Sequence, residues 1–204
     1  MQSLITSLPG YKVFEYSLVL APHQDLCNKI MHIKDDFAKE YKTDCARWNK
    51  PYVSLLHFRQ IEMMEDKITN NFRITAMGYP AFKVALKDFG SFPSHSIYIN
   101  ITSKLPIQNL VKQIRTASQR LLKFDEDHKP FFMMEPTITI GRKLKPWQYE
   151  KGWLAYSNKH VTAQFIADGM LLLKRPVDEP KYQIIKEFKF QNLPIATVQG
   201  QLFG

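Results

Sequence analysis

The sequence predicts an α+β fold in which one mixed unit is used twice. A repeated motif and a repeated order of elements indicate this. The segment that begins at Pro51 reads Pro-Tyr-Val-Ser-Leu, and the segment that begins at Pro136 reads Pro-Thr-Ile-Thr-Ile. Both run from proline to a β-branched residue, a hydroxyl and an aliphatic residue, the pattern of a short strand with proline at its entrance. Each copy precedes a predicted helix and a predicted pair of strands.

The motif strands each place two hydroxyls on one face. Side chains alternate along a strand, so Tyr52 and Ser54 share a face, as do Thr137 and Thr139. The aliphatic residues between them point the other way, toward a core. Two such strands are expected to form the walls of one polar groove. The alternative is two ordinary strands that share a common pattern, because short matches are often accidental.

The elements before the second motif copy follow from hydrophobic periodicity. Apolar residues recur at helical spacing from Leu26 to Tyr41 and again from Ile107 to Leu122, whereas shorter apolar runs with β-branched residues predict strands. A turn over residues 90–94 separates two of the strands, and residues 124–132 are expected to form a charged loop. The expected strands and helices are, in order, strand 16–21, helix 23–42, strand 51–58, helix 65–77, strands 82–89 and 96–101, and a helix from about Pro106.

The second half repeats the pattern of motif strand, helix and hairpin. Pro146 suits the first turn of a helix that runs to about Tyr156. Residues 160–173 predict two strands joined by a turn at Asp168 and Gly169, and residues 182–190 predict a last strand. We expect residues 1–204 to form a single bilobal domain, with a loose tail over residues 191–204.

Composition bounds the function only loosely. The chain has 204 residues and a formal net charge of +9, and such a surplus favours anionic partners such as nucleotides or RNA. No stretch approaches a membrane helix and the N-terminus lacks a basic signal-peptide region, so a cytoplasmic location is expected. Cys27 and Cys45 lack metal-site spacing and are expected to be reduced. We expect no metal, no cofactor and a monomer.

The sequence resembles the two-histidine phosphoesterase superfamily, and most closely its 2′-5′ RNA ligase-like branch. The resemblance extends from Tyr16 to Phe190. It rests on the two motif strands, Phe82-Lys-Val-Ala-Leu, the Phe92-Pro93 turn, Gly141-Arg142 and the late hairpin Phe165–Leu173. It implies a bilobal protein in which two antiparallel sheets flank a central groove, with helices on the outside and one His-x-Thr/Ser motif on each wall.

Both histidine positions of that family pattern are replaced. The resemblance implies that one histidine acts as general base, the other as general acid, and that the hydroxyls two residues on bind phosphate. Here Tyr52 and Thr137 stand at the histidine positions, and Ser54 and Thr139 keep the hydroxyl class. A phenol with its ordinary pKa of about 10 is a poor base near neutrality, and threonine can do neither task. Losing each partner of an acid–base pair removes roughly 10²–10⁴-fold of rate.

The other histidines are expected to be structural. His160-Val-Thr162 is a His-x-Thr, but it lies where no motif strand is expected, so we interpret it as an ordinary strand start with a relocated catalytic motif as the alternative. His57 lies three residues beyond Ser54, and regular alternation predicts that it points to the opposite face and packs there. Four more are expected to lie on the surface: His23, His32, His95 and His128.

Although both motif histidines are replaced, the remaining residues of the two motifs predict a binding site for a phosphate-bearing ligand. The candidate substrate-binding residues are Tyr52, Ser54, Thr137, Thr139 and Arg142. Arginine suits phosphate because its donors form a fork. Lys50 and Lys143 also stand near the strand ends. Aromatic residues that could stack a base, although core packing is the expectation for each, are Phe58, Phe92 and Trp153.

Three functions remain open. The first is a degenerate family member that binds a phosphate-bearing small molecule or RNA without the usual hydrolysis. The second is an active phosphodiesterase or RNA end-processing enzyme with a rearranged proton relay that uses Tyr52. The third is a non-catalytic, partner-binding scaffold.

Overall fold

The computed structural model describes residues 11–43 and 50–194. Its strands are β1 (Val13–Leu20), β2 (Val53–Ile61), β3 (Phe82–Phe92), β4 (Ser96–Ile101), β5 (Phe131–Phe132), β6 (Thr137–Arg142), β7 (Thr162–Ala167), β8 (Gly169–Pro176) and β9 (Gln183–Lys189). Its helices are α1 (Gln24–Tyr41), α2 (Glu65–Met77), α3 (Lys104–Leu122) and α4 (Pro146–Tyr156), with a single 3-10 turn, η1 (Glu62–Met64). None of the helices in these ranges has the length and apolar character needed to cross a membrane.

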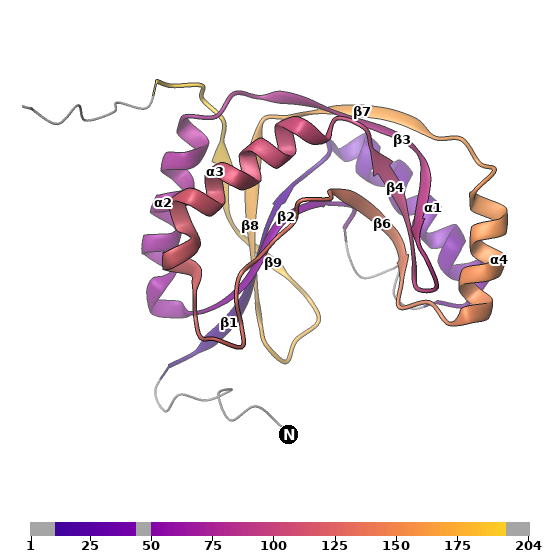
Figure 1. Ribbon diagram of the computed structural model, residues 1–204, viewed down its shortest axis with the longest axis horizontal. Coiled ribbons are helices and arrows are strands. Elements are labelled where there is room, and N and C mark those ends of the chain that lie inside the picture. Colours follow the sequence, from indigo (N-terminus) through magenta and orange to yellow (C-terminus); the bar gives the residue numbers. More distant parts are fainter. Residues whose placement is uncertain (1–10, 44–49, 195–204) are drawn as a thin grey trace, which may run out of the picture.

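The described strands form two antiparallel sheets with helices on their outer sides (Figure 1). One sheet has the order β5-β2-β1-β8-β9 and is covered by α2 and α3; the other has the order β6-β4-β3-β7 and is covered by α1 and α4. The motif strands β2 and β6 contact each other where the sheets meet. The fold class predicted from the sequence, with two sheets and outer helices, is confirmed.

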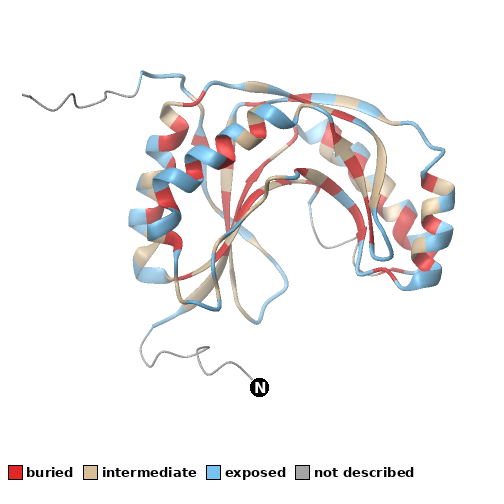
Figure 2. Ribbon diagram, viewed as in Figure 1, coloured by how far each residue is buried: buried red, intermediate tan, exposed pale blue. Residues whose placement is uncertain are grey.

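Buried residues lie along the strands and on the helix faces that cover them (Figure 2). Val53 and Leu55 of β2 and Ile138 and Ile140 of β6 are fully buried, as strand alternation predicted. Because consecutive side chains point to opposite sides of a strand, the burial of these residues leaves the other face of each motif strand for polar groups.

Helix α4 is joined to the end of α1 by one glutamine. Pro146 occupies the first turn, as predicted, and the Lys145 backbone N–H donates to Gln148 Oε1 over 2.9 Å, which caps the helix. The Gln148 Nε2 group donates to the Tyr41 carbonyl over 2.8 Å. The buried amide thereby ties together the two helices that support the four-stranded sheet.

Several predictions about elements were wrong in detail: β1 begins at Val13 and β2 continues to Ile61, each three residues beyond the predicted bound. The strand expected to end at residue 89 continues to Phe92, and β5 lies inside the expected loop over 124–132 and pairs with β2. The late hairpin is not a hairpin: β7 pairs with β3, whereas β8 pairs with β1 and β9 in the other sheet. Gly169 permits this crossing, because a Cβ atom there would lie 2.6 Å from the Phe188 carbonyl oxygen. Residues 195–204 of the expected tail lie outside the described residues.

Candidate functional site

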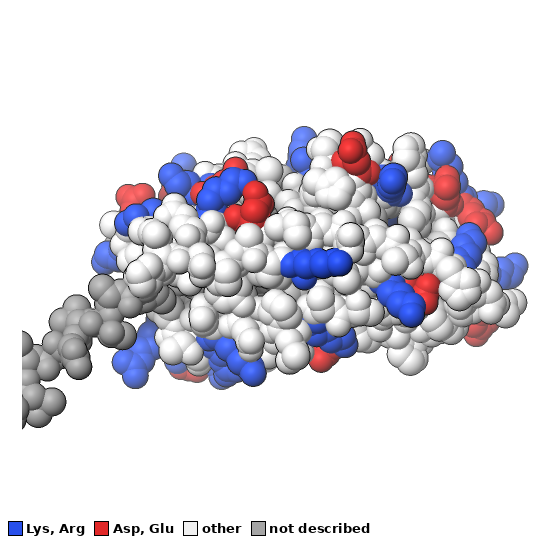
Figure 3. Space-filling model, turned by 90° about the horizontal axis from the view of Figure 1, so that it is seen from above, with Lys and Arg blue, Asp and Glu red and all other residues white. Residues whose placement is uncertain are grey.

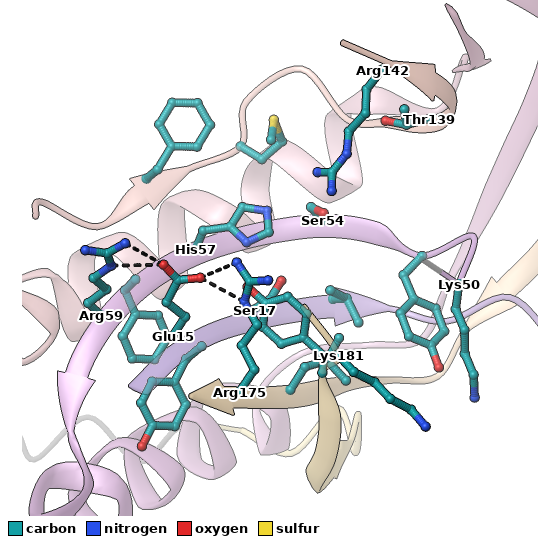
Figure 4. Close-up of a pocket in the computed structure, with 18 of the residues that line it drawn as sticks. Glu15, Ser17, Lys50, Ser54, His57, Arg59, Thr139, Arg142, Arg175 and Lys181 are labelled. Carbon is teal, nitrogen blue, oxygen red and sulfur yellow. Dashed lines mark hydrogen bonds and ion pairs between the residues drawn. The ribbon is translucent and has the colours of Figure 1, made fainter. Parts of the chain in front are cut away.

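A groove of about 780 Å³ lies between the two sheets. Side chains from β1, β2 and β8 line it on one side, and side chains from β6 line it on the other. The connections before β5 and β9 complete the wall with Lys129 and Lys181. Figure 4 shows the side chains that converge there. The face that carries β3 and β7, by contrast, shows scattered charges of both signs (Figure 3).

All five candidate substrate-binding residues line this groove: Tyr52, Ser54, Thr137, Thr139 and Arg142. The two hydroxyl pairs, distant in the sequence, therefore stand on facing walls of one space. The side chain of Arg142 extends from β6 toward Ser54 on β2 (Figure 4). Their juxtaposition is a property of the fold, whereas a binding role for them is a proposal.

Each motif strand contains a β-bulge at the same offset from its proline. Leu18 pairs with Leu56 but Val19 pairs with Ser54, so Leu55 is an extra residue in β2. Ile97 pairs with Gly141 but Tyr98 pairs with Thr139, so Ile140 is the extra residue in β6. A bulge interrupts the alternation of side chains. A residue three positions beyond the last groove-facing residue, which regular alternation would point to the opposite face, therefore points into the groove as well.

The bulge in β2 corrects the prediction for His57. The imidazole was expected on the face opposite Ser54, but both side chains line the groove. Within the sheet, His57 is the register partner of Ser17 on β1 and of Phe131 on β5, which also line the groove. The adjacent aliphatic residues Leu55 and Leu56, both fully buried, were the signal for a bulge.

Burial lowers the pKa of His57 below its ordinary value. Glu15 opposes this effect, and the positive charges of Arg142 and Arg175 add to it. The imidazole is therefore neutral near pH 7, the state in which it can accept a proton.

One carboxylate fixes two arginines in the floor of the groove. The Arg59 Nε and Nη2 groups donate to Glu15 Oε1 over 3.0 and 2.6 Å, and Arg175 Nε donates to Glu15 Oε2 over 2.8 Å. Burial raises the pKa of Glu15, but the two arginines outweigh burial and hold the pKa below its ordinary value. Both guanidinium groups are thus held in place and need no large rearrangement to face a ligand.

The lining of the groove is strongly basic. Only two of the acidic side chains in the described residues line it, Glu15 and Asp127. Seven cationic side chains line it: Lys34, Lys50, Arg59, Lys129, Arg142, Arg175 and Lys181. Lys34 is buried, and burial together with the nearby Arg142 lowers its pKa to about 8. Low-dielectric walls lined by one sign of charge concentrate the electrostatic field within a cleft.

Of two other histidines, one lines the groove and the other lies outside it. His128, expected on the surface, lines the groove, and its Nδ1 atom lies 2.8 Å from Asp125 Oδ2. His160 does not line it; its side chain is 87% exposed and its Nδ1 atom lies 3.2 Å from Asp88 Oδ1. His160 is therefore no relocated catalytic histidine of this groove.

Only some of the other residues that the sequence suggested as ligand contacts line the groove. Lys50 and Phe58 line the groove, but Lys143, Phe92 and Trp153 do not. Phe58 is buried and stacks on Tyr16, with ring centroids 5.0 Å apart, so it packs as core. Phe131 also lines the groove and is 60% exposed, and no sequence pattern singled it out.

No group of three or more potential metal-ligating side chains occurs among the described residues. Cys27 is a free thiol that donates to the Pro22 carbonyl over 3.2 Å. Cys45 lies outside the part of the chain that the structure describes.

Comparison with protein families gives a match to the 2′-5′ RNA ligase superfamily over residues 22–179. The chain belongs to the 2′-5′ RNA ligase superfamily. Comparison with curated proteins found no match. The match spans both motif strands. Tyr52 directly precedes β2, and Thr137 is the first residue of β6.

Solved structures share the fold at low identity. Escherichia coli LigT in its apo form superposes with a TM-score of 0.61 at 12% identity, over 88% of this chain and 98% of LigT. The LigT complex with 3′-AMP gives a TM-score of 0.58 at 11% identity, over the same shares of the two chains. The protein TT0787 of Thermus thermophilus gives 0.58 at 14% identity, over 87% of this chain and 98% of that protein.

Proposed function

We propose that this member of the 2′-5′ RNA ligase superfamily binds a phosphate-bearing ligand, a nucleotide or an RNA end, in the groove between β2 and β6. The observation that carries the proposal is the convergence of Arg142 with Ser54 and Thr139 in one cationic cavity. A phosphate between the motif strands would accept hydrogen bonds from hydroxyls on both walls and from a forked guanidinium. Such charge-assisted hydrogen bonds are the strong ones in proteins.

The proposed binding does not include the hydrolysis that two motif histidines would drive. Tyr52 and Thr137 stand where the resemblance to the two-histidine phosphoesterases calls for imidazoles. Without that pair, the groove keeps hydroxyls and positive charge, which suffice for binding a phosphate but supply no acid–base couple at those positions.

The class of ligand is supported by what a structural neighbour has been crystallised with. Escherichia coli LigT has been solved in complex with 3′-AMP, phosphate, ATP and NADP+. The cationic lining here suits the same class of anion, and 780 Å³ is a typical size for a small-molecule site. We propose the cytoplasm as its location, where nucleotides and RNA ends occur and where a free thiol such as Cys27 stays reduced.

Calorimetric titration with inorganic phosphate, 3′-AMP and a short RNA bearing a 3′-phosphate tests this proposal. Ser54→Ala and Thr139→Ala should each weaken binding about 3- to 30-fold, because each removes a hydrogen bond to an anion. Thr162→Ala, which removes an exposed hydroxyl on β7 outside the groove, is the matched control and should bind like the wild type. Affinity indifferent to both groove variants would refute the proposal, and absence of any binding would favour a partner-binding scaffold.

A further inference from the structure

The groove contains an imidazole at a position that the two-histidine pattern does not use. His57 follows the β2 bulge, as Arg142 follows the β6 bulge, at the same distance from the motif proline in each copy. The duplicated frame therefore presents a histidine from one wall and an arginine from the other. Both side chains line the groove (Figure 4).

In the sheet, His57 lies beside charged groups that hold one another in place. Ser17 and Phe131 flank it across the sheet, and the next pair along the same face is Glu15 with Arg59. Glu15 also holds Arg175, so charged groups that are themselves fixed surround the imidazole. Because these charged groups are already in place, they need little rearrangement when an anionic ligand binds beside the imidazole.

Its charged surroundings favour a base over an acid. Arg142 and Arg175 face His57 from β6 and β8, and Glu15 faces it from β1. Burial and the two arginines outweigh the carboxylate, so the pKa of His57 lies below its ordinary value and the ring is neutral at pH 7. The same arginines would bind the non-bridging oxygens of a phosphodiester and place its phosphorus near the imidazole.

We propose that His57 is a catalytic residue, the general base for slow hydrolysis of a phosphodiester bound in this groove. The inference rests on the proposed binding function. His57 takes a proton from a water molecule, whose oxygen forms a bond to phosphorus. The bond between phosphorus and the leaving oxygen breaks, and that oxygen takes a proton from solvent. The imidazolium releases its proton to solvent, so one water and one diester give one monoester and one alcohol.

A single imidazole limits the rate. In-line displacement puts the attacking and leaving oxygens on opposite sides of phosphorus, so one side chain cannot serve both. Since a positioned acid or base contributes roughly 10²–10⁴-fold, we expect turnover lower by about that factor than for an enzyme with both groups.

The test follows 2′,3′-cyclic AMP by chromatography at pH 5–9, with binding of 3′-AMP measured in parallel by calorimetry. We expect slow formation of the monophosphate, with a rate that rises with pH and levels off below the ordinary range of histidine. His57→Gln and His57→Asn should lose about 100-fold or more of the rate but keep 3′-AMP affinity within about threefold. His160→Gln, outside the groove, is the matched control and should leave the rate unchanged.

Binding and hydrolysis can fail separately. Turnover that survives in both His57 variants would overturn the inference, as would the absence of turnover across this pH range in a protein that binds 3′-AMP. The latter result would leave the proposed function intact. A protein that neither binds 3′-AMP nor turns over the cyclic nucleotide would contradict both. The pH profile of the wild type tests the role of His57 even where a variant is poorly folded.

Discussion

His57 and Arg142 occupy equivalent positions in the two motif strands, each just beyond a β-bulge that brings its side chain into the same groove. The equivalence extends to their neighbours, because buried aliphatic residues at Leu55 and Ile140 are the extra residues of the two bulges. A duplicated backbone thus presents different chemistry from its two walls, an imidazole and a guanidinium.

Arg142 is predicted to supply much of the affinity for phosphate. Arg142→Gln should weaken binding of 3′-AMP about 10- to 100-fold, because hydrogen bonds to a charged group contribute roughly 1.5–3 kcal/mol. Lys143→Gln removes the same charge from the adjacent exposed residue, which does not line the groove, and is the matched control. Calorimetry on both variants checks the prediction. Equal losses in the two variants would mean that net charge, and not the position of Arg142, determines affinity.

Lys34 is predicted to couple phosphate binding to proton uptake. Burial and Arg142 lower its pKa to about 8, and Asp35 opposes them. A bound anion favours the charged ammonium, so affinity should fall as pH rises from 7 to 9, by up to about tenfold. A phosphomonoester is already doubly charged over this range, with a second pKa near 6, and so contributes little to the change.

Calorimetry of 3′-AMP binding at pH 7, 8 and 9 measures this coupling. Lys34→Met should flatten the pH dependence of binding, and it should also remove the rise in stability that the free wild type shows above about pH 8. The sign follows from linkage: a folded-state pKa below the unfolded one makes the free wild type gain stability as pH rises from about 8 toward 10.5. A pH dependence that persists in Lys34→Met would assign the coupling to another group.

Glu15 is predicted to stabilise the folded protein through its two arginines. Glu15→Gln should lower the free energy of unfolding at pH 7 by about 1–3 kcal/mol, since it leaves Arg59 and Arg175 without their shared charge. The pKa of Glu15 is depressed in the folded state, so this stability is present above the unfolded pKa and is lost as pH falls through the folded value.

Urea unfolding of both proteins between pH 7 and pH 3 tests the role of Glu15. The difference between wild type and Glu15→Gln should shrink as the solution is acidified. Glu150→Gln, an exposed carboxylate on α4, serves as the control and should change stability by less than about 0.5 kcal/mol. A difference that stays constant with pH would show that the arginines do not depend on the charge of Glu15.

Gly141 is predicted to be required for the bulge in β6 to pack against α1. A Cβ atom at this position would lie 2.6 Å from Phe37 Cε1 and 3.2 Å from Leu144 Cδ2. Gly141→Ala should therefore cost about 1–3 kcal/mol of stability, the usual effect of overpacking. Thermal or urea unfolding should show that Gly141→Ala costs less in a Phe37→Leu background than in the wild type. Additive effects would mean that the ring of Phe37 is not the obstacle.

Much of the fold could be predicted from local pattern, but the full set of groove residues could not. The bounds of α2 and α4 and the facing hydroxyl pairs followed from period and from the repeated motif. His57 was placed on the wrong face because a bulge is a relation between two strands: Leu55 is extra only relative to Leu18 and Val19 of β1. The separation of β7 from β8 into different sheets likewise depends on partners far away in the sequence.

Sequence reasoning also missed the charged floor of the groove. Glu15 and Arg175 are far apart in the sequence, and only the pairing of β1 with β8 brings them opposite each other. Neither belongs to a motif, and the alternating polar positions that they occupy are equally typical of a solvent-facing strand. Net charge indicated an anionic ligand but did not indicate where on the surface it would bind.

A crystal structure of the full chain with inorganic phosphate would test the central claim most directly. We predict phosphate density between β2 and β6, within hydrogen-bonding distance of Ser54, Thr139 and the Arg142 guanidinium, with the imidazole of His57 facing it. Phosphate bound elsewhere, or a groove that stays empty at saturating phosphate, would contradict the claim.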